Sequence, residues 1–255
     1  RETVLDLLRT LEFNTIVPRV PDPTQSPQPL PTDSSPTTQP EVAYETILDQ
    51  ERLSAFLNDI RKLGSFTFDV ETTSKSAMVA DLVGISFSLE SGNAAYVPVG
   101  HETGPQLALE TALNMIKPIM EDQTISKISH NASYDMTVLA NYGVNVDGLT
   151  FDTMVAAHIL GEQSLGLKNL AFNKLHLEMT PIQNIIGTGR NQKTMAEVPI
   201  NVVSKYAAAD ADMTGRLQTI FHEGLNSKDR LWDLFNQMEL PLVPVLVKMQ
   251  RNGIS

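Results

Sequence analysis

The sequence predicts a mixed α/β fold, in which helices pack on one sheet built from an antiparallel meander and additional parallel strands. Three observations lead to this prediction. Residues 66–99 contain three strand-like segments separated by short turns. Segments with helical periodicity precede and follow that region. The chain has 255 residues, 42% of them hydrophobic, which is enough for one sizeable core plus extra segments.

The predicted elements of the main domain run from 41 to 230. Periodic apolar residues predict a helix over 49–61, and strict alternation predicts a strand over 66–71. Alternation returns over 82–89, and after a turn a third strand covers 94–99, where Pro98 indicates an edge or an end. A helix over 105–121, a short strand over 125–129 and then mostly helix complete the domain.

Three flanking segments differ from this domain. Residues 1–17 predict one amphipathic helix, which we expect to be the tail of a preceding domain. Eight of the 15 prolines lie in 18–40, so a semi-extended linker is expected over 18–41. Residues 229–255 predict another apolar helix, kinked or interrupted by Pro241 and Pro244, that begins the next domain. We therefore expect the chain to be a piece of a longer polypeptide.

The composition excludes several classes of protein. The absence of cysteine excludes disulfide scaffolds, thiolate metal sites and cysteine nucleophiles. No apolar run approaches the roughly 18–20 residues needed to span a bilayer, and no signal peptide opens the chain, so no membrane partner is expected. The net charge of -11 argues at first against a simple basic nucleic-acid-binding module.

Asp69 and Glu71 form the first candidate pattern. They are two residues apart on a predicted strand, so both carboxylates project from one face. Adjacent carboxylates repel, and a hard divalent cation such as Mg²⁺ would relieve that repulsion. The alternative is a solvated strand face with two surface acids. Asp152, which precedes a helical segment, is expected to be a helix N-cap rather than a ligand.

Two further patterns lie on predicted helices. Asn131 and Asp135 are four residues apart and share a face, but an N-cap and the helix dipole would favour the same residues. Tyr206 and Asp210 have the same spacing, which an ordinary amphipathic surface would also explain. Asp212 lies on another side of that helix and is expected to be a solvated or capping acid.

The order of these motifs is more specific than any one of them. D-x-E at 69–71, N-x-x-Y-D at 131–135 and Y-x-x-x-D at 206–210 together resemble the DEDD exonuclease superfamily, in its Tyr-bearing branch. The stretches F-D-V-E-T, L-V-G-I-S-F, A-Y-V-P-V and Y-A-A-A-D-A-D resemble the 3′–5′ proofreading exonuclease domain of a bacterial-type family A DNA polymerase I. This resemblance covers 42–228. Residues 7–13 resemble the end of that family's 5′ nuclease region, and 239–246 resemble the start of its polymerase domain.

The resemblance implies a ribonuclease H-like mixed sheet and hydrolysis of the 3′-terminal phosphodiester of single-stranded or frayed DNA, releasing 5′-mononucleotides. Two divalent metal ions are expected as cofactors, Mg²⁺ or alternatively Mn²⁺, because two cations can activate water and offset the charge on the leaving oxygen. The expected partners are a single-stranded DNA 3′ end and the polymerase and 5′ nuclease domains of the same parent chain. We expect a monomer in the bacterial cytoplasm, associated with the nucleoid through DNA.

Each residue has an expected role in that reaction. Asp69 would bridge the two metal ions, with Glu71 and Asp210 on the water side and Asp135 on the leaving-group side. Tyr206 would position the attacking water rather than deprotonate it, because the ordinary pKa of a phenol is near 10. Five residues are expected to contact nucleic acid: Thr72, Asn131, Tyr134, Arg190 and Lys193. For the last two, a flexible surface loop over 187–193 is the alternative. Family members often carry an apolar wedge where this chain has Lys75, so a wedge must come from Met78 or elsewhere.

Two other interpretations remain open: a catalytically weak scaffold domain that binds DNA, and a ribonuclease D-like RNA 3′ exonuclease. The complete set of acids disfavours the first, and the flanking segments disfavour the second.

The net charge also needs a second interpretation, because residues 41–230 hold 14 basic and 23 acidic groups. Four of these acids are the expected metal ligands, and two bound Mg²⁺ would still leave the domain acidic. We therefore expect weak, metal-dependent binding of a frayed 3′ end.

Overall fold

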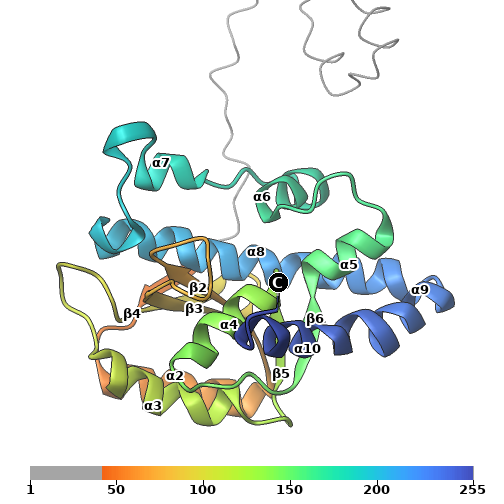
Figure 1. Cartoon of the computed structure of the whole chain (residues 1–255), viewed down its shortest axis with the longest axis horizontal. Helices are drawn as coiled ribbons and strands as arrows, with labels where there is room; N and C mark the ends of the chain where they lie inside the picture. Colours follow the sequence, from red (N-terminus) through yellow and green to blue (C-terminus); the bar gives the residue numbers. More distant parts are fainter. Residues whose placement is uncertain (1–41, 255) are drawn as a thin grey trace, which may run out of the picture. The chain divides into compact units, whose positions relative to one another are not determined.

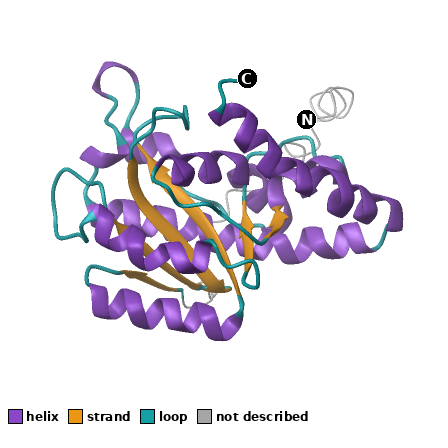
Figure 2. Ribbon diagram, turned by 60° about the horizontal axis from the view of Figure 1, so that its bottom comes forward, coloured by secondary structure: helices purple, strands orange, loops and turns teal. Residues whose placement is uncertain are grey.

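The computed structural model describes residues 42–254, which form a six-stranded mixed sheet with helices on both faces (Figure 1, Figure 2). The strands are β1 (Ala43–Thr46), β2 (Ser65–Thr72), β3 (Leu82–Glu90), β4 (Asn93–Pro98), β5 (Ser126–Ser129) and β6 (Leu149–Asp152). Their order in the sheet is β1-β4-β3-β2-β5-β6. The strands β2, β3 and β4 form the predicted antiparallel meander, while β1, β5 and β6 each pair in parallel. The predicted fold class is confirmed.

Two strands were missing from the sequence-based description. The strand β1 follows the proline-rich segment in the sequence, and β6 is found where mostly helix was predicted. Each has only four residues, whose burial does not alternate along the strand, and each is held by pairing with a neighbour that is distant in sequence. Pro98 ends β4 as expected, but β4 is not an edge strand because β1 pairs with it.

The helices are α2 (Gln50–Leu63), α3 (Leu109–Met120), α4 (Ala132–Asn141), α5 (Thr153–Leu160), α6 (Leu167–Leu170), α7 (Ile182–Ile186), α8 (Ile200–Asn226), α9 (Asp229–Leu234) and α10 (Leu240–Arg251). The helix predicted over 105–121 begins only at Leu109. The preceding residues form a bend instead, in which the Gln106 amide bonds both the N–H and the C=O of His101.

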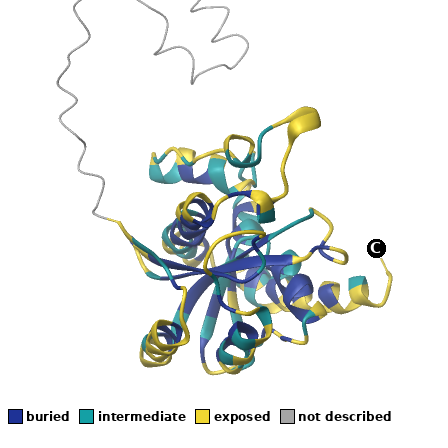
Figure 3. Ribbon diagram, turned by 90° about the vertical axis from the view of Figure 1, so that its left-hand side faces the viewer, coloured by how far each residue is buried: buried dark blue, intermediate teal, exposed yellow. Residues whose placement is uncertain are grey.

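The two faces of the sheet have different roles. Phe66, Phe68 and Val70 of β2 are buried in the main core with residues of α2, α3 and α4. The long helix α8 covers the other face and packs on β1, β2, β3 and β4. Figure 3 shows the strands buried between helices whose outer surfaces are exposed. The alternation of β2 therefore points Asp69 and Glu71 toward α8.

The last helix, α10, differs from the sequence-based prediction in one respect. The sequence predicts that the prolines kink or interrupt the last helix, and of these two alternatives the interruption is wrong, because α10 continues through Pro244 and Pro241 lies in its first turn. A π-helical turn at Phe235–Glu239 directly precedes it. Val243 and Val247 of α10 join the main core. The predicted helix over 1–17 and the linker over 18–41 lie outside the described residues. None of the helices in the described part is both long and apolar enough to cross a membrane.

Candidate active site

The first two acids lie at the end of β2. Asp69 is partly exposed, and Glu71 is buried. Glu71 lies opposite Gly84 of β3, and a register shift separates Glu71 from Thr72. Such an irregularity bends a strand and redirects the side chains near it. Because side chains alternate along β2, both carboxylates lie on the face of the sheet that α8 covers, close to the end of the strand.

Gly84 is required by a close approach beside Glu71. A Cβ atom at this position would overlap the hydroxyl of Tyr96, whose side chain is fully buried. The Tyr96 hydroxyl lies 2.9 Å from His101 Nε2, and His101 Nδ1 donates to the Val198 carbonyl at 3.0 Å. The imidazole Nε2 therefore accepts the Tyr96 proton, and burial lowers the pKa of His101, which keeps it neutral. The buried Tyr96 hydroxyl is thus held in place beside Gly84, the residue that pairs with Glu71.

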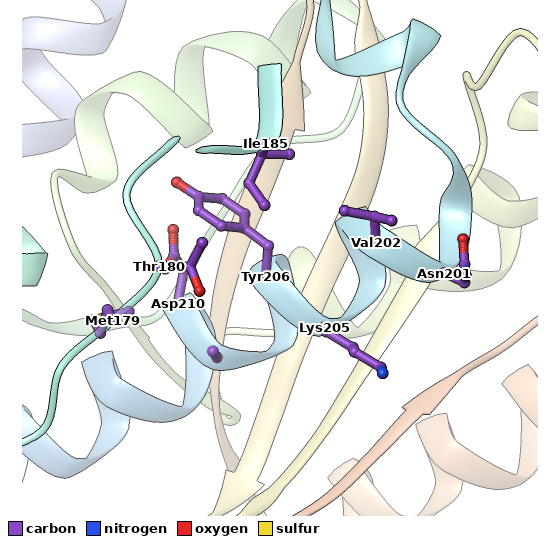
Figure 4. A pocket seen from close by; sticks show the side chains of 9 residues that line it. Met179, Thr180, Ile185, Asn201, Val202, Lys205, Tyr206 and Asp210 are labelled. Carbon is purple, nitrogen blue, oxygen red and sulfur yellow. The ribbon is translucent and has the colours of Figure 1, made fainter. Parts of the chain in front are cut away.

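The helix α8 supplies Tyr206 and Asp210. Small side chains, Ala207, Ala208 and Ala211, are fully buried where α8 lies on the sheet and allow the helix to approach the strands closely. Figure 4 shows Tyr206 and Asp210 projecting from the same side of α8, beside Thr180 and Ile185. Asp210 is 9% exposed. One carboxylate oxygen from each of Asp69, Glu71 and Asp210 lies within 4.8 Å of the others.

Asp135 approaches the cluster from α4 and is held in a fixed orientation. It is 3% exposed and accepts a 2.7 Å hydrogen bond from Ser129 Oγ at the end of β5. Among the described residues, 42–254, the group of acids with converging carboxylate oxygens contains Asp69, Glu71 and Asp210 but not Asp135. Its charge nevertheless raises the pKa of Asp69, so the two carboxylates lie in the same electrostatic environment.

Asn131 occupies the N-cap position of α4, but its side chain does not cap the helix. The Asp152 carboxylate accepts hydrogen bonds from the Asn131 and Ala132 N–H groups at 3.2 and 2.7 Å. It also caps α5, at the N–H groups of Met154 and Val155. Asp152 therefore joins the starts of two helices, which confirms it as a cap. Asn131 has φ of 66°, a left-handed conformation that Asn tolerates better than most residues.

Burial makes the charged state of the acids unfavourable. Desolvation, followed by repulsion from Asp135, raises the pKa of Asp69 well above its usual range. Desolvation and the charge of Asp210 do the same to the pKa of Glu71. Burial raises the pKa of Asp210, and that of Asp135 to about 8. Without a cation Asp135 would therefore hold a proton near neutral pH, and for the other three acids the charged form is made less favourable, as expected when like charges converge in a partly desolvated site.

The residues present fit divalent metal ions. Three carboxylates converge, and all their donors are hard oxygen atoms of the kind that Mg²⁺ and Mn²⁺ prefer. A bound cation would also remove the repulsion that raises the pKa values of these acids. Asp69, Glu71 and Asp210 are therefore the residues best placed to hold a metal ion.

Four of the five expected nucleic-acid contacts line one cleft. A cleft of about 680 Å³ is lined by Glu71, Thr72, Asn131 and Tyr134, and also by Lys75, Lys193 and part of α7. Thr72 Oγ1 and the Tyr134 hydroxyl lie 2.5 Å apart, and both donate to the Ser74 carbonyl, which fixes the turn after Glu71. Lys193 lines the cleft, whereas Arg190 is exposed and does not line it. Met78, the alternative wedge, is 40% exposed.

Sequence reasoning was wrong about Asp212 and missed Lys168. Asp212 is fully buried rather than solvated, and it accepts hydrogen bonds from the Tyr44 hydroxyl at 2.6 Å and the Gly92 N–H at 2.9 Å. Lys168 Nζ donates to Tyr206 Oη at 2.9 Å and lies 3.3 Å from Asp210 Oδ1. No pattern could have found this contact, because Lys168 belongs to another helix and is about 40 residues away from both partners in sequence.

Comparison with known proteins gives a consistent result. A family model for DNA polymerase A, described as 3′–5′ exonuclease, matches residues 44–226. DNA polymerase I of Chloroflexus aurantiacus is 39% identical over 223 residues, which cover 87% of this chain and 24% of the relative. DNA polymerase I of Pseudomonas aeruginosa is 36% identical over 227 residues, 84% of this chain and 24% of the relative. The chain thus spans about a quarter of the length of these curated relatives.

Solved structures show the same fold at lower identity. A structure described as the POL domain of Pol1 from M. smegmatis, in complex with DNA primer-template and dNTP, has a TM-score of 0.63 and 23% identity, covering 80% of this chain and 31% of that one. The structure of Brucella melitensis NrnC has a TM-score of 0.61 and 18% identity, and the match covers 83% of this chain and 94% of that one. These likenesses support the ribonuclease H-like architecture that the resemblance implied.

Proposed function

The chain belongs to the 3′–5′ exonuclease domains of bacterial DNA polymerase I, and we propose that residues 42–228 hydrolyse the 3′-terminal phosphodiester of single-stranded or frayed DNA. The products would be 5′-mononucleotides, and the biological role would be proofreading for a polymerase. The observation that carries this proposal is the convergence of Asp69, Glu71 and Asp210 from β2 and α8 within 4.8 Å. A scaffold domain without activity would not need three desolvated, mutually repelling carboxylates.

In this proposal two metal ions, Mg²⁺ or Mn²⁺, are bound by Asp69, Glu71, Asp135 and Asp210. When bound, such ions acidify a water molecule and offset negative charge on the phosphate and the leaving oxygen. Asp69 would be the ligand shared by the two ions, a role that the family resemblance implies and that its place in the converging group of acids supports. Asp135 would act on the leaving-group side, in the orientation that Ser129 gives it.

Tyr206 would orient the attacking water as a hydrogen-bond donor. Burial, together with the charges of Asp210 and Glu71, raises the pKa of its hydroxyl above the ordinary phenol value. The phenol therefore keeps its proton at neutral pH and cannot act as a general base. Thr72, Asn131 and Tyr134 would hold the terminal nucleotide in the cleft that they line together with Lys193. Arg190 would meet the strand only outside this cleft.

The wider organisation follows from the relatives. We propose that 1–17 end a 5′ nuclease domain, that 18–41 link it to the exonuclease domain, and that 229–255 begin a polymerase domain. The parent chain would act as a monomer on a DNA 3′ end. Because the relatives are bacterial DNA polymerases I, it would work in the bacterial cytoplasm, where it would meet the nucleoid.

The proposal is tested by incubating the chain with 3′-labelled single-stranded DNA, and with RNA of the same sequence, in Mg²⁺ and in EDTA. We expect EDTA-sensitive release of labelled mononucleotide from DNA. Asp69→Asn should slow release by about 10³-fold, because the central ligand is lost. Asp81→Asn is the matched control, since Asp81 is an exposed acid outside the cluster. No release from either substrate would refute an active nuclease, and release from RNA alone would favour the ribonuclease D-like alternative.

A further inference from the structure

Lys168 places a positive charge directly against the acid cluster. Its Nζ atom lies 2.9 Å from Tyr206 Oη and 3.3 and 3.4 Å from the two oxygens of Asp210. The ammonium group also lies 4.3 Å from the centre of the Tyr206 ring, a cation–π distance. The side chains of Lys168 and Asp210 are 28% and 12% exposed. The ion pair is therefore largely shielded from water and contributes more than an exposed pair would.

Lys168 has no equivalent around the other acids. Within 42–254, it is the basic residue that forms an ion pair with one of the four acids, and Asp69, Glu71 and Asp135 have none. Its charge also acts beyond Asp210, since it opposes the rise in pKa of Asp69 and Glu71. One ammonium group thus offsets part of the repulsion among all three converging carboxylates.

We propose that Lys168 is the resident counter-cation of this site: it holds Asp210 and Tyr206 in position before metal binds, and it competes with the metal ion for the Asp210 carboxylate. This inference rests on the proposed function for the identity of the site but concerns a residue outside the ligand set. Lys168 is a positioning residue, because it acts on the reaction through Asp210 and Tyr206.

The chemistry of lysine suits this role. An ammonium group is a compact charge with three donors on a flexible four-carbon stem, so it can contact a phenol and a carboxylate together and withdraw when a stronger cation arrives. By donating to Tyr206 Oη, it also fixes the position of the phenol oxygen beside Asp210. A divalent cation must overcome this ion pair to reach Asp210, so Lys168 lowers metal affinity while it keeps the metal-free site assembled.

Lys168→Met tests this directly, because methionine keeps most of the apolar stem and removes the charge. Binding of Mn²⁺ to the whole chain, without nucleic acid, is followed by electron paramagnetic resonance. Thermal unfolding is measured in EDTA and in saturating Mn²⁺. We expect Lys168→Met to bind Mn²⁺ about three- to fivefold more tightly, which is the loss of one partly exposed ion pair. We also expect a lower Tm in EDTA, and saturating Mn²⁺ should remove that difference.

Two variants make the test specific. Lys168→Arg keeps the charge and should retain both the wild-type Mn²⁺ affinity and the Tm in EDTA. Lys205→Met removes a similar charge from the exposed side of α8 near Tyr206, where no ion pair with the acids exists, and should change affinity by less than about twofold. If Lys168→Met does not fold, Lys168→Gln replaces it in the same measurements.

Unchanged or weaker Mn²⁺ binding by Lys168→Met would overturn the proposal, as would a loss of Tm that is equal in EDTA and in Mn²⁺. Either result would make Lys168 a packing residue only. The outcome is separable from that of the proposed function, since Mn²⁺ binding is measured without nucleic acid. Binding with the expected Lys168 effect but without DNA cleavage would refute the nuclease proposal alone.

Discussion

The metal-free site should make the domain less stable as pH rises, and Asp135 allows this effect to be isolated. Burial raises the pKa of the Asp135 carboxyl from its ordinary value of 3.8 to about 8 in the folded state. Between pH 5.5 and 7.5 the folded domain therefore holds a proton that the unfolded chain has released. Each such proton lowers the free energy of unfolding by up to about 1.4 kcal/mol for every pH unit gained.

Asp135→Asn removes this titration while keeping a side chain that can accept the Ser129 hydrogen bond. In EDTA, the variant should therefore become increasingly more stable than the wild type as pH rises. Over two pH units the difference should grow by at most about 2.7 kcal/mol. Contributions from buried histidines are present in both proteins and cancel in the difference. Saturating Mg²⁺ should abolish the slope, because bound cations stabilise the ionised acids.

The assay is equilibrium urea unfolding followed by the fluorescence of Trp232, the sole tryptophan, at pH 5.5, 6.5 and 7.5. Asp59→Asn is the control. Lys62 lowers the pKa of this exposed acid, so Asp59 is ionised in the folded and the unfolded protein from pH 5.5 to 7.5. The difference in free energy of unfolding between Asp59→Asn and the wild type should therefore not vary with pH. If the difference in free energy of unfolding between Asp135→Asn and the wild type does not vary with pH, or shrinks as pH rises, the raised pKa of Asp135 in the metal-free site is refuted.

Two other substitutions test the geometry and the chemistry. Gly84→Ala should lower the free energy of unfolding by about 1–3 kcal/mol, since its methyl group would overlap Tyr96. In a double-mutant cycle with Tyr96→Leu, the two losses of stability should not add. Additive losses would contradict the close approach of Gly84 and Tyr96. Tyr206→Phe should reduce the rate of DNA hydrolysis by about 10²-fold, because the hydrogen-bond donor to the reacting water is lost. Mn²⁺ binding should change little, because the carboxylates remain and Lys168 still pairs with Asp210 when its bond to Tyr206 Oη is gone. A wild-type rate in single-turnover assays would remove Tyr206 from the mechanism.

The sequence predicted those parts of the site that depend on local geometry. A strand period of two residues puts Asp69 and Glu71 on one face, and a helical spacing of four does the same for Tyr206 and Asp210. These rules hold whatever surrounds the element. The motif order then identified the family before any contact was known, and the family model agrees with it.

What the sequence did not predict depends on tertiary contacts. The strands β1 and β6 have four residues each and exist because neighbouring strands pair with them. Asp212 lies away from Asp210 on α8, as helix geometry requires, but Tyr44 and Gly92 cover that side as well. Lys168 reaches Tyr206 from a separate helix. In each case the decisive neighbour is distant in sequence, where periodicity gives no information.

If the converging acids form the metal-binding centre of a nuclease, the ions should be visible in crystals of the chain soaked in Mn²⁺. We expect anomalous diffraction peaks in contact with Asp69, Glu71 and Asp210, and no such peaks in an Asp69→Asn crystal treated in the same way. Full Mn²⁺ peaks elsewhere on the domain, with none among these three carboxylates, would contradict this metal-binding centre.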